Sequence, residues 1–215
     1  MLTHFRPALV LLALFTLLTG VAYPLAITGI AQKLFPHQAN GSLIEKDGKL
    51  IGSSLIGQNF SGEQYFHGRP SATTDTDPND SSKTIPAPYN AANSGGSNAG
   101  PTAKSLIDRV KDDTAKLRAD NPDVAPNTPV PVDLVTTSGS GLDPHISPAA
   151  AEYQLPRVAK VRGMTEESLR KLVVANIEPR ALGFIGEPVV NVMALNMALD
   201  AQAPAKAATA ADARH

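Results

Sequence analysis

The hydrophobic pattern is dominated by one uncharged stretch near the start of the chain. Residues 7–32, which include ALVLLALFTLL and YPLAITGIA, contain no acidic or basic side chain, whereas the rest of the 215-residue chain is polar and rich in Gly and Pro. As a helix this stretch is about 39 Å long, against about 30 Å for the hydrocarbon core of a bilayer. The pattern predicts a transmembrane helix over residues 7–32, bent at Pro24, after a short cytoplasmic N-terminus at residues 1–6.

A cleaved signal peptide is the alternative for the same stretch. Gly20-Val21-Ala22 has the small residues of a cleavage site behind a short apolar region. Against cleavage, the apolar sequence continues past Ala22, where a mature soluble protein would have to hide it. Arg6 and the amino terminus lie before the stretch, and Lys33 is the only close charge after it, which gives a slight bias toward a cytoplasmic N-terminus. Both interpretations place the bulk of the chain on the extracytoplasmic side.

Beyond the uncharged stretch, the pattern predicts a mixed α/β (α+β) extracytoplasmic domain over residues 33–200. Residues 42–57 contain two β-prone runs around Asp47-Gly48, a strong hairpin signal. Residues 102–120 have the spacing of an amphipathic helix. A second helix is expected after Thr165, whose hydroxyl suits the N-cap position ahead of two glutamates.

The remaining segments predict less regular structure. Residues 60–101 are loop-like, and residues 132–137 (VDLVTT) are expected to form a short strand. LGFIGEP, at residues 182–188, is a Gly-rich turn, and VVNV with the apolar MALNMALD completes the domain. The Ala-rich tail at residues 201–215 has little to bury and is predicted to be disordered.

Composition excludes several function classes. The net charge is −1 with no basic face, which argues against a nucleic-acid partner, and the absence of Cys excludes disulfides and thiol catalysis. His67 with Asp75 and Asp77 could be drawn as a metal site. No second His lies at ligand spacing, so a solvated loop is the better interpretation, and we predict no metal site.

The stretch SGSGLDPHISP at residues 138–148 allows three interpretations. Ser140 could be a nucleophile near Asp143 and His145, but the first Gly of G-x-S-x-G is missing; a phosphate cradle would need a Lys. A structural turn explains more of the residues, with a capping Ser ahead of a Pro at the start of a helix. That helix is expected to kink or break at Pro156 and to stop at Gly163. The turn residues are Gly139, Gly141, Asp143, Pro144 and Ser147.

Several longer motifs carry a family resemblance. These are YFHGRPSATT, PYNAANSGGSNAGPT, VPVDLVTTSGSGLDPHISPAAAEYQLPRVA and LGFIGEPVVNVMALNMALD, together with the N-terminal span. In this combination the chain closely resembles the C subunit of the bacterial Kdp potassium-transporting P-type ATPase, over nearly its whole length. The acidic DTDPNDSSK segment and the Ala-rich tail are the exceptions.

The resemblance implies an accessory, non-catalytic subunit of an ATP-driven potassium importer in the bacterial inner membrane. Its implied partners are a channel-like potassium-translocating subunit, a P-type ATP-hydrolysing subunit, a small stabilising subunit and membrane lipid. The family is described as a catalytic chaperone that raises the ATP affinity of the pumping subunit. Gln154, by its place in the motif, is the implied nucleotide contact, with ATP and K+ handled by the complex and no tightly bound cofactor. An extracytoplasmic domain conflicts with that contact, because ATP is scarce there.

We therefore expect a role in assembly and in access of potassium to its path. The helix would pack against partner spans through small residues, and the outer domain would sit over the mouth of the path. Two other function classes remain open: a membrane-anchored periplasmic ligand-binding module using LIGQNFSGEQYFHGRP as its ligand loop, and a Ser/His hydrolase. Acidic residues in the 75–80 loop could enrich cations, although screening weakens this. The small residues on the helix are Gly20, Ala22, Ala26 and Gly29.

Overall fold

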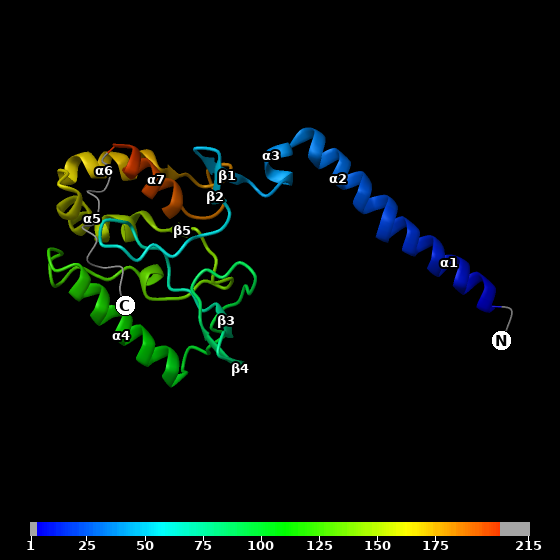
Figure 1. The fold of residues 1–215 in the computed structure, drawn as a ribbon, viewed down its shortest axis with the longest axis horizontal. Coiled ribbons are helices and arrows are strands. Elements are labelled where there is room, and N and C mark those ends of the chain that lie inside the picture. Colours follow the sequence, from blue (N-terminus) through cyan, green and yellow to red (C-terminus); the bar gives the residue numbers. More distant parts are fainter. Residues whose placement is uncertain (1–3, 203–215) are drawn as a thin grey trace. The chain divides into compact units, whose positions relative to one another are not determined.

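The computed structural model describes residues 4–202 and shows a chain of two compact units (Figure 1). The units adjoin in the sequence between Ser53 and Ser54. The first contains a long apolar helix and a hairpin, and the second contains a mixed arrangement of helices and short strands. The predicted disordered tail lies outside the described residues from position 203 onward.

The apolar stretch forms one helical run in three parts: α1 (Phe5–Leu17), a π-helical turn η2 (Leu18–Ala22) and α2 (Tyr23–Leu34). Over Phe5–Leu34 the best window has a mean hydropathy of 2.2, and none of that window is buried. The run is long and apolar enough to cross a membrane, and it includes all of residues 7–32.

The π-helical turn lies directly before Pro24. Pro24 has no N–H to donate to the carbonyl of Gly20, and its ring crowds that carbonyl. A π-helical turn removes this conflict by widening the helix locally. Near this turn the hydroxyl of Thr19 also donates a hydrogen bond to the backbone carbonyl oxygen of Phe15 at 2.7 Å. The irregularity expected at Pro24 therefore takes the form of a π-helical turn within a continuous run.

A short helix α3 (Pro36–Ala39) is followed by the predicted hairpin of β1 (Leu43–Lys46) and β2 (Lys49–Ser53), which pair in antiparallel fashion. Asp47 and Gly48 connect the strands with φ of +53° and +73°. Two positive φ angles match the twist of the paired strands, and Asp-Gly adopts them at low cost. The hairpin prediction is confirmed.

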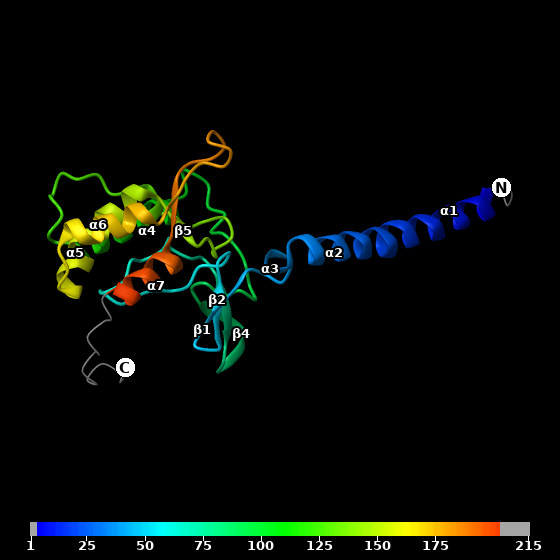
Figure 2. The same cartoon turned by 90° about the horizontal axis from the view of Figure 1, so that it is seen from above.

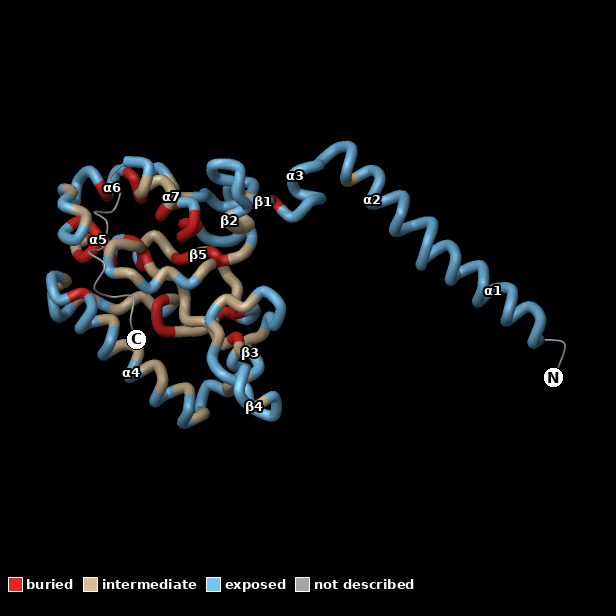
Figure 3. Tube along the Cα trace, in the orientation of Figure 1, coloured by how far each residue is buried: buried red, intermediate tan, exposed pale blue. Residues whose placement is uncertain are grey.

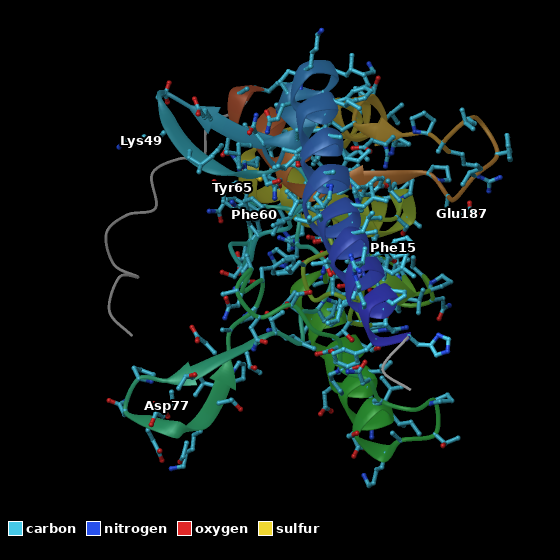
Figure 4. All side chains as sticks on the ribbon, turned by 90° about the vertical axis from the view of Figure 1, so that its right-hand side faces the viewer. Phe15, Lys49, Phe60, Tyr65, Asp77 and Glu187 are labelled. Carbon is cyan, nitrogen blue, oxygen red and sulfur yellow. The ribbon has the colours of Figure 1, made fainter. Side chains whose placement is uncertain are left out.

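A second antiparallel hairpin, β3 (Thr74–Asp77) and β4 (Asp80–Pro86), lies where the sequence predicted only loop. Its strands are polar and largely exposed, so no alternation of apolar residues marked them. The turn is stabilised locally, since the carboxylate of Asp77 accepts a hydrogen bond from the backbone of Asn79 at 2.8 Å. Figure 4 shows Asp77 near the end of this hairpin.

The second unit is built around one antiparallel sheet of order β5-β7-β6, comprising β5 (His145–Ile146), β6 (Ile177–Glu178) and β7 (Val189–Asn191). The buried core in Figure 3 lies on this sheet and on α5 (Pro148–Arg162), α6 (Glu166–Ala175) and α7 (Val192–Gln202). The predicted helix α4 (Lys104–Asp120) has no fully buried residue and places Leu117 against the core. Fully buried core residues are Phe66, Ile146, Leu155, Val158, Leu169, Val190, Leu195 and Leu199.

One expectation about local structure was wrong, and a second was wrong in part. The predicted strand at residues 132–137 is instead a 3₁₀ helix, η3 (Val132–Leu134), because Leu134 and Val135 are both buried and consecutive burial does not suit a strand with one buried face. Helix α5 continues through Pro156, so the break, one of the two outcomes expected there, does not occur. The fixed φ of Pro is helical, and the surrounding residues of α5 are buried in the core, so packing compensates for the lost hydrogen bond.

Candidate functional site

The polar motifs of the sequence meet at one place in the second unit, which we call the motif junction (residues 69–73, 89–96 and 136–144). The backbone N–H of Gly95 donates to the carbonyl of Ser140 at 2.9 Å. Ser71 donates from its hydroxyl to the carbonyl of Gly141 at 2.7 Å, and Tyr89 donates to the carbonyl of Arg69 at 2.8 Å. Three loops that are far apart in sequence are thereby tied together.

Gly141 is the glycine that the motif junction requires. Its φ is +68°, and a Cβ there would lie 2.5 Å from the side chain of Thr73 and 2.7 Å from the carbonyl of Gly95. Gly139 differs, because a Cβ added there would meet no atom within 4 Å. Of the two glycines assigned to the turn, only Gly141 combines a left-handed backbone with close packing.

Asp143 is the charged centre of the motif junction. One carboxylate oxygen pairs with Arg69 at 3.1 Å, and the other accepts a hydrogen bond from the backbone of His145 at 3.0 Å. Burial raises the pKa of Asp143, but hydrogen bonds from His145 and the charge of Arg69 outweigh it and hold that pKa below its usual value. The side-chain hydrogen bond to Asp143 raises the pKa of His145 against the opposing effect of burial. The three side chains form a partly exposed ionic group.

The end of the motif junction connects to two helices. The carbonyl of Pro144 accepts a hydrogen bond from Val192, the first residue of α7, at 2.9 Å. Ser147 is the N-cap of α5, and its hydroxyl accepts from the backbone of Ala150 at 3.1 Å. Its own backbone N–H donates to the carboxylate of Asp133 at 2.6 Å. These contacts fix the direction in which both helices leave the turn.

Two buried amides grip the neighbouring residues Phe66 and His67, and we call this arrangement the amide clamp. Asn196 accepts from the N–H of Phe66 and donates to its carbonyl, both at 2.9 Å. Gln154 accepts from the N–H of His67 at 2.8 Å and donates to its carbonyl at 3.1 Å. Each amide side chain thus replaces the strand partner that this irregular segment lacks.

The amide of Gln154 has no free hydrogen-bonding capacity. The residue is 0% exposed; its oxygen also accepts from Arg157 at 2.9 Å, and its nitrogen also donates to the carbonyl of Ala150 at 3.3 Å. With two bonds accepted and two donated, the side chain is fully satisfied inside the domain. Contact between this amide and a nucleotide would require these bonds to break.

Two arginines of α5 hold the segment before the amide clamp. Arg157 donates to the carbonyls of Glu63 and Tyr65. Arg162 donates to the carbonyl of Gln64 at 2.9 Å, and its guanidinium lies 4.9 Å from the centre of the Tyr65 ring. Tyr65 packs against Phe60 with a centroid separation of 5.4 Å (Figure 4). The aromatic side chains therefore fasten this irregular segment to the domain.

A cleft of about 520 Å³ lies beside this segment. Burial raises the pKa of Tyr89 in its wall to about 12, and burial with the charge of Arg157 lowers the pKa of His67. Acidic and basic side chains are balanced, which suits a small polar ligand better than a polyphosphate. The charged lining residues are Glu63, Asp113 and Asp120 with Arg69, Lys116 and Arg157.

The catalytic interpretation has no support from the geometry around Ser140. Its hydroxyl accepts from the backbone of Leu142 at 3.1 Å and lies 3.5 Å from the hydroxyl of Ser138. The ring nitrogens of His145 lie 3.5 Å from Asp143 and 3.9 Å from Glu178. Within residues 4–202, no group of three or more His, Asp or Glu side chains could hold a metal ion.

The small residues of the apolar helix do not all share one face. Ala22, Ala26 and Gly29 follow each other at intervals of four and three, which puts them on one side of a helix. Gly20 lies two residues before Ala22 and therefore points elsewhere. A Cβ at Gly20 or Gly29 would meet no atom within 4 Å, so both positions are open.

Several residues whose side chains hold the domain together were not identified from the sequence. Arg69 and Asn196 are the main ones, since they anchor the motif junction and the amide clamp. Asn196 did leave a signal, because it is a polar residue inside the apolar run MALNMALD of a helix. A polar residue on a buried helix face needs a partner, and that partner can be found only in the folded structure.

The fold and the polar contacts of residues 4–202 define a class of protein: one long apolar helix, followed in the chain by a small mixed α/β domain whose polar residues mainly hold its own loops together. A family model described as K+-transporting ATPase, c chain (KdpC) matches residues 5–201. The chain is 66% identical over 200 residues to the potassium-transporting ATPase KdpC subunit of Bradyrhizobium diazoefficiens, covering 93% of this chain and 98% of the relative. It is 67% identical over 201 residues to that of Rhodopseudomonas palustris, covering 94% and 99%.

The chain therefore belongs to the KdpC family, the c chains of the K+-transporting ATPase. The resemblance drawn from the motifs is confirmed. Membership implies association with a membrane and with other subunits of that ATPase.

Proposed function

We propose that the chain is a non-catalytic subunit that assembles the potassium importer and controls access to its path. In this proposal the apolar helix spans the bacterial inner membrane beside helices of the partner subunits. The second unit faces the periplasm, over the mouth of the potassium path. The partners are the channel-like subunit that carries K+, the P-type subunit that binds and hydrolyses ATP, and the small stabilising subunit.

The observation that carries this proposal is the unburied helix Phe5–Leu34. None of its residues is buried, so its apolar side chains require lipid or partner helices as neighbours. Arg6, in the first turn of the helix, supports an N-terminus in the cytoplasm. A domain whose buried polar residues are used internally also fits an accessory role better than a catalytic one.

The structure of the amide clamp bears on how ATP affinity would change. We propose that Gln154 stabilises the domain and that any effect on ATP affinity passes through the pumping subunit. This resolves the conflict between a periplasmic domain and cytoplasmic ATP, because no direct contact is needed. The support is the complete use of the Gln154 amide by His67, Ala150 and Arg157.

Topology is the first test, and the chain suits it because it contains no Cys. Single cysteines replace Lys49 and Lys83, both exposed, and His4 serves as the control on the other side of the helix. The complex is labelled with a membrane-impermeant maleimide in cells whose outer membrane is permeabilised. Labelling of K49C and K83C with protection of H4C is expected. Labelling of H4C alone would reverse the orientation and overturn the access role.

Helix packing is tested by Gly29→Leu, which fills the open position on the face shared with Ala22 and Ala26. The variant is expected to lower recovery of the partner subunits in affinity purification. Gly20→Leu, on a different side of the helix, is the matched control. Unchanged recovery for Gly29→Leu would exclude this face as the packing surface.

One observation favours a second candidate function, a periplasmic ligand-binding module. The cleft is lined by Asn59, Phe60, Ser61, Glu63, His67, Gly68 and Arg69, all within the segment proposed as a ligand loop. Chemical-shift changes in these residues of the intact chain upon titration with small polar metabolites would support it. If none of the ligands tested changes the chemical shifts of the cleft residues, the ligand-binding function is rejected and the assembly role remains.

A further inference from the structure

The hairpin between β6 and β7 carries an exposed apolar tip. We use "apolar tip" for Leu182, Phe184 and Ile185, whose relative exposures are 82%, 73% and 51%. Figures 2 and 4 show this loop, in orange, projecting from the helices of the second unit, with Glu187 labelled on it in Figure 4. Side chains this apolar are normally buried, so a projecting group of three points to a contact with another surface.

The backbone beneath the apolar tip is ordered. Ala181 and Ile185 exchange two backbone hydrogen bonds, of 3.0 and 2.9 Å, and Arg180 pairs with Glu187 at 2.5 Å across the base. Leu182 has φ of +53°, a left-handed conformation that is unfavourable for a residue with a Cβ. The hairpin therefore holds a defined shape and pays conformational energy to present Leu182 outward.

The defined shape of the hairpin favours a protein, and not lipid, as the binding partner of the apolar tip. Segments that bind the membrane surface combine apolar side chains with Lys, Arg, Trp or Tyr at the headgroup level. Residues 180–187 read RALGFIGE and contain a single basic side chain, Arg180, which is already paired with Glu187. The apolar tip thus lacks the basic and amphipathic aromatic residues that would hold it at a bilayer.

The size of the apolar tip limits its partner to one already held nearby. A specific interface between free proteins buries about 1,200–2,000 Å² in total, whereas three side chains of this size supply only a few hundred Å². A second free copy of this chain would therefore not be retained. A partner that also contacts the apolar helix meets the tip at a high effective concentration, which makes a small contact sufficient.

We infer that the apolar tip inserts into an apolar pocket of a partner subunit of the K+-transporting ATPase complex. This inference rests on the proposed function, in which the helix is held by the same complex. At the base of the hairpin, Glu187, Pro188 and Val189 line a groove of about 420 Å³, whose wall also carries the charged residues Arg69, Asp133 and Asp143. Val132, on the wall of this groove, is 69% exposed. Apolar residues lining the groove are Pro131, Val132, Ile146, Ala149, Pro188 and Val189.

The test uses the full complex in native membranes. Phe184 is replaced by the photoreactive residue p-benzoylphenylalanine, and in a separate chain Ala26 is replaced in the same way. Irradiation is expected to crosslink position 184 to a partner subunit. Crosslinks from position 184 only to lipid, or only to a second copy of this chain, would overturn the inference.

The probe at Ala26 separates two kinds of failure. Crosslinking from Ala26 with none from position 184 would reject the apolar tip while leaving the proposed function intact. Absence of crosslinks to partner subunits from both positions would reject the proposed function itself.

Recovery of the complex provides a second measurement. Phe184→Ser is expected to lower co-purification of the partner subunits about tenfold under detergent challenge, as for loss of a central aromatic anchor. Val174→Ser is the matched control, because Val174 is a 60% exposed apolar residue on α6. Thermal melting of each purified chain shows that the second unit remains folded. Equal recovery for the two variants would refute the inference.

Discussion

Replacing Asn196 by Ala should remove a large share of the stability of the second unit. Asn196 is 1% exposed, and its amide makes two 2.9 Å hydrogen bonds to the backbone of Phe66, which is 0% exposed. Truncation leaves the N–H and C=O of Phe66 buried without partners. An unpaired buried polar group costs about 1–3 kcal/mol, so we expect a loss of about 4 kcal/mol from the pair. A domain is stable by only about 5–15 kcal/mol, so the effect should be large.

Native-state hydrogen exchange on the full chain in detergent measures this loss where it occurs. The amides of Phe66 and of α5 should exchange at least about a hundredfold faster in Asn196→Ala, as a loss of a few kcal/mol requires. Asn93→Ala is the matched control, because the Asn93 amide donates at 2.8 Å to the carbonyl of Thr74 but is exposed to water. We expect less than about 1 kcal/mol for the control. Similar losses in both variants would refute the reasoning about buried partners.

Three further predictions follow from the same contacts. Gln154→Ala should lower the melting temperature of the chain, while the assembled complex at a temperature where it is folded keeps its ATP affinity; weaker ATP affinity without loss of stability would contradict this. Gly141→Ala should destabilise by more than about 2 kcal/mol, because of its φ of +68° and a 2.5 Å approach to a side chain, whereas Gly139→Ala should be nearly neutral in urea unfolding. The lowered pKa of Asp143 gives stability that is present above about pH 3.8 and lost as the pH falls through its folded pKa. The raised pKa of His145 gives stability that is full below pH 6.5 and lost as the pH rises through its folded pKa. The melting-temperature difference between wild type and Asp143→Asn should therefore be largest between these limits, and a difference independent of pH would be evidence against this pairing.

Local signals in the sequence predicted the elements that depend on local physics. The hairpin at Asp47-Gly48 and the caps at Thr165 and Gly163 were recognised because turn geometry and capping involve neighbouring residues. The β3–β4 hairpin was missed because its polar strands carry no apolar alternation. The expected break at Pro156 failed because packing around α5 outweighs a local preference.

In the candidate site, too, the sequence predicted the local features and missed the contacts between distant residues. The stretch at residues 138–148 was correctly expected to turn into a helix, but its partners were invisible, because Arg69 lies about seventy residues away in the chain. Gln154 stood out by its place in a motif. Only its burial and its bonds to His67 indicate that the side chain is used inside the domain.

The sequence by itself determined the long apolar helix, the composition of the following domain and, through its motifs, the KdpC family. Those features depend on runs of neighbouring residues, whose hydropathy and spacing are readable along the chain. The tertiary structure decided the amide clamp, the motif junction and the apolar tip. Each of these depends on which distant residues meet, or on which apolar side chains are left without a neighbour. Burial and hydrogen-bond pairing are properties of the folded arrangement, because a buried polar group is stable only where its partner is placed against it.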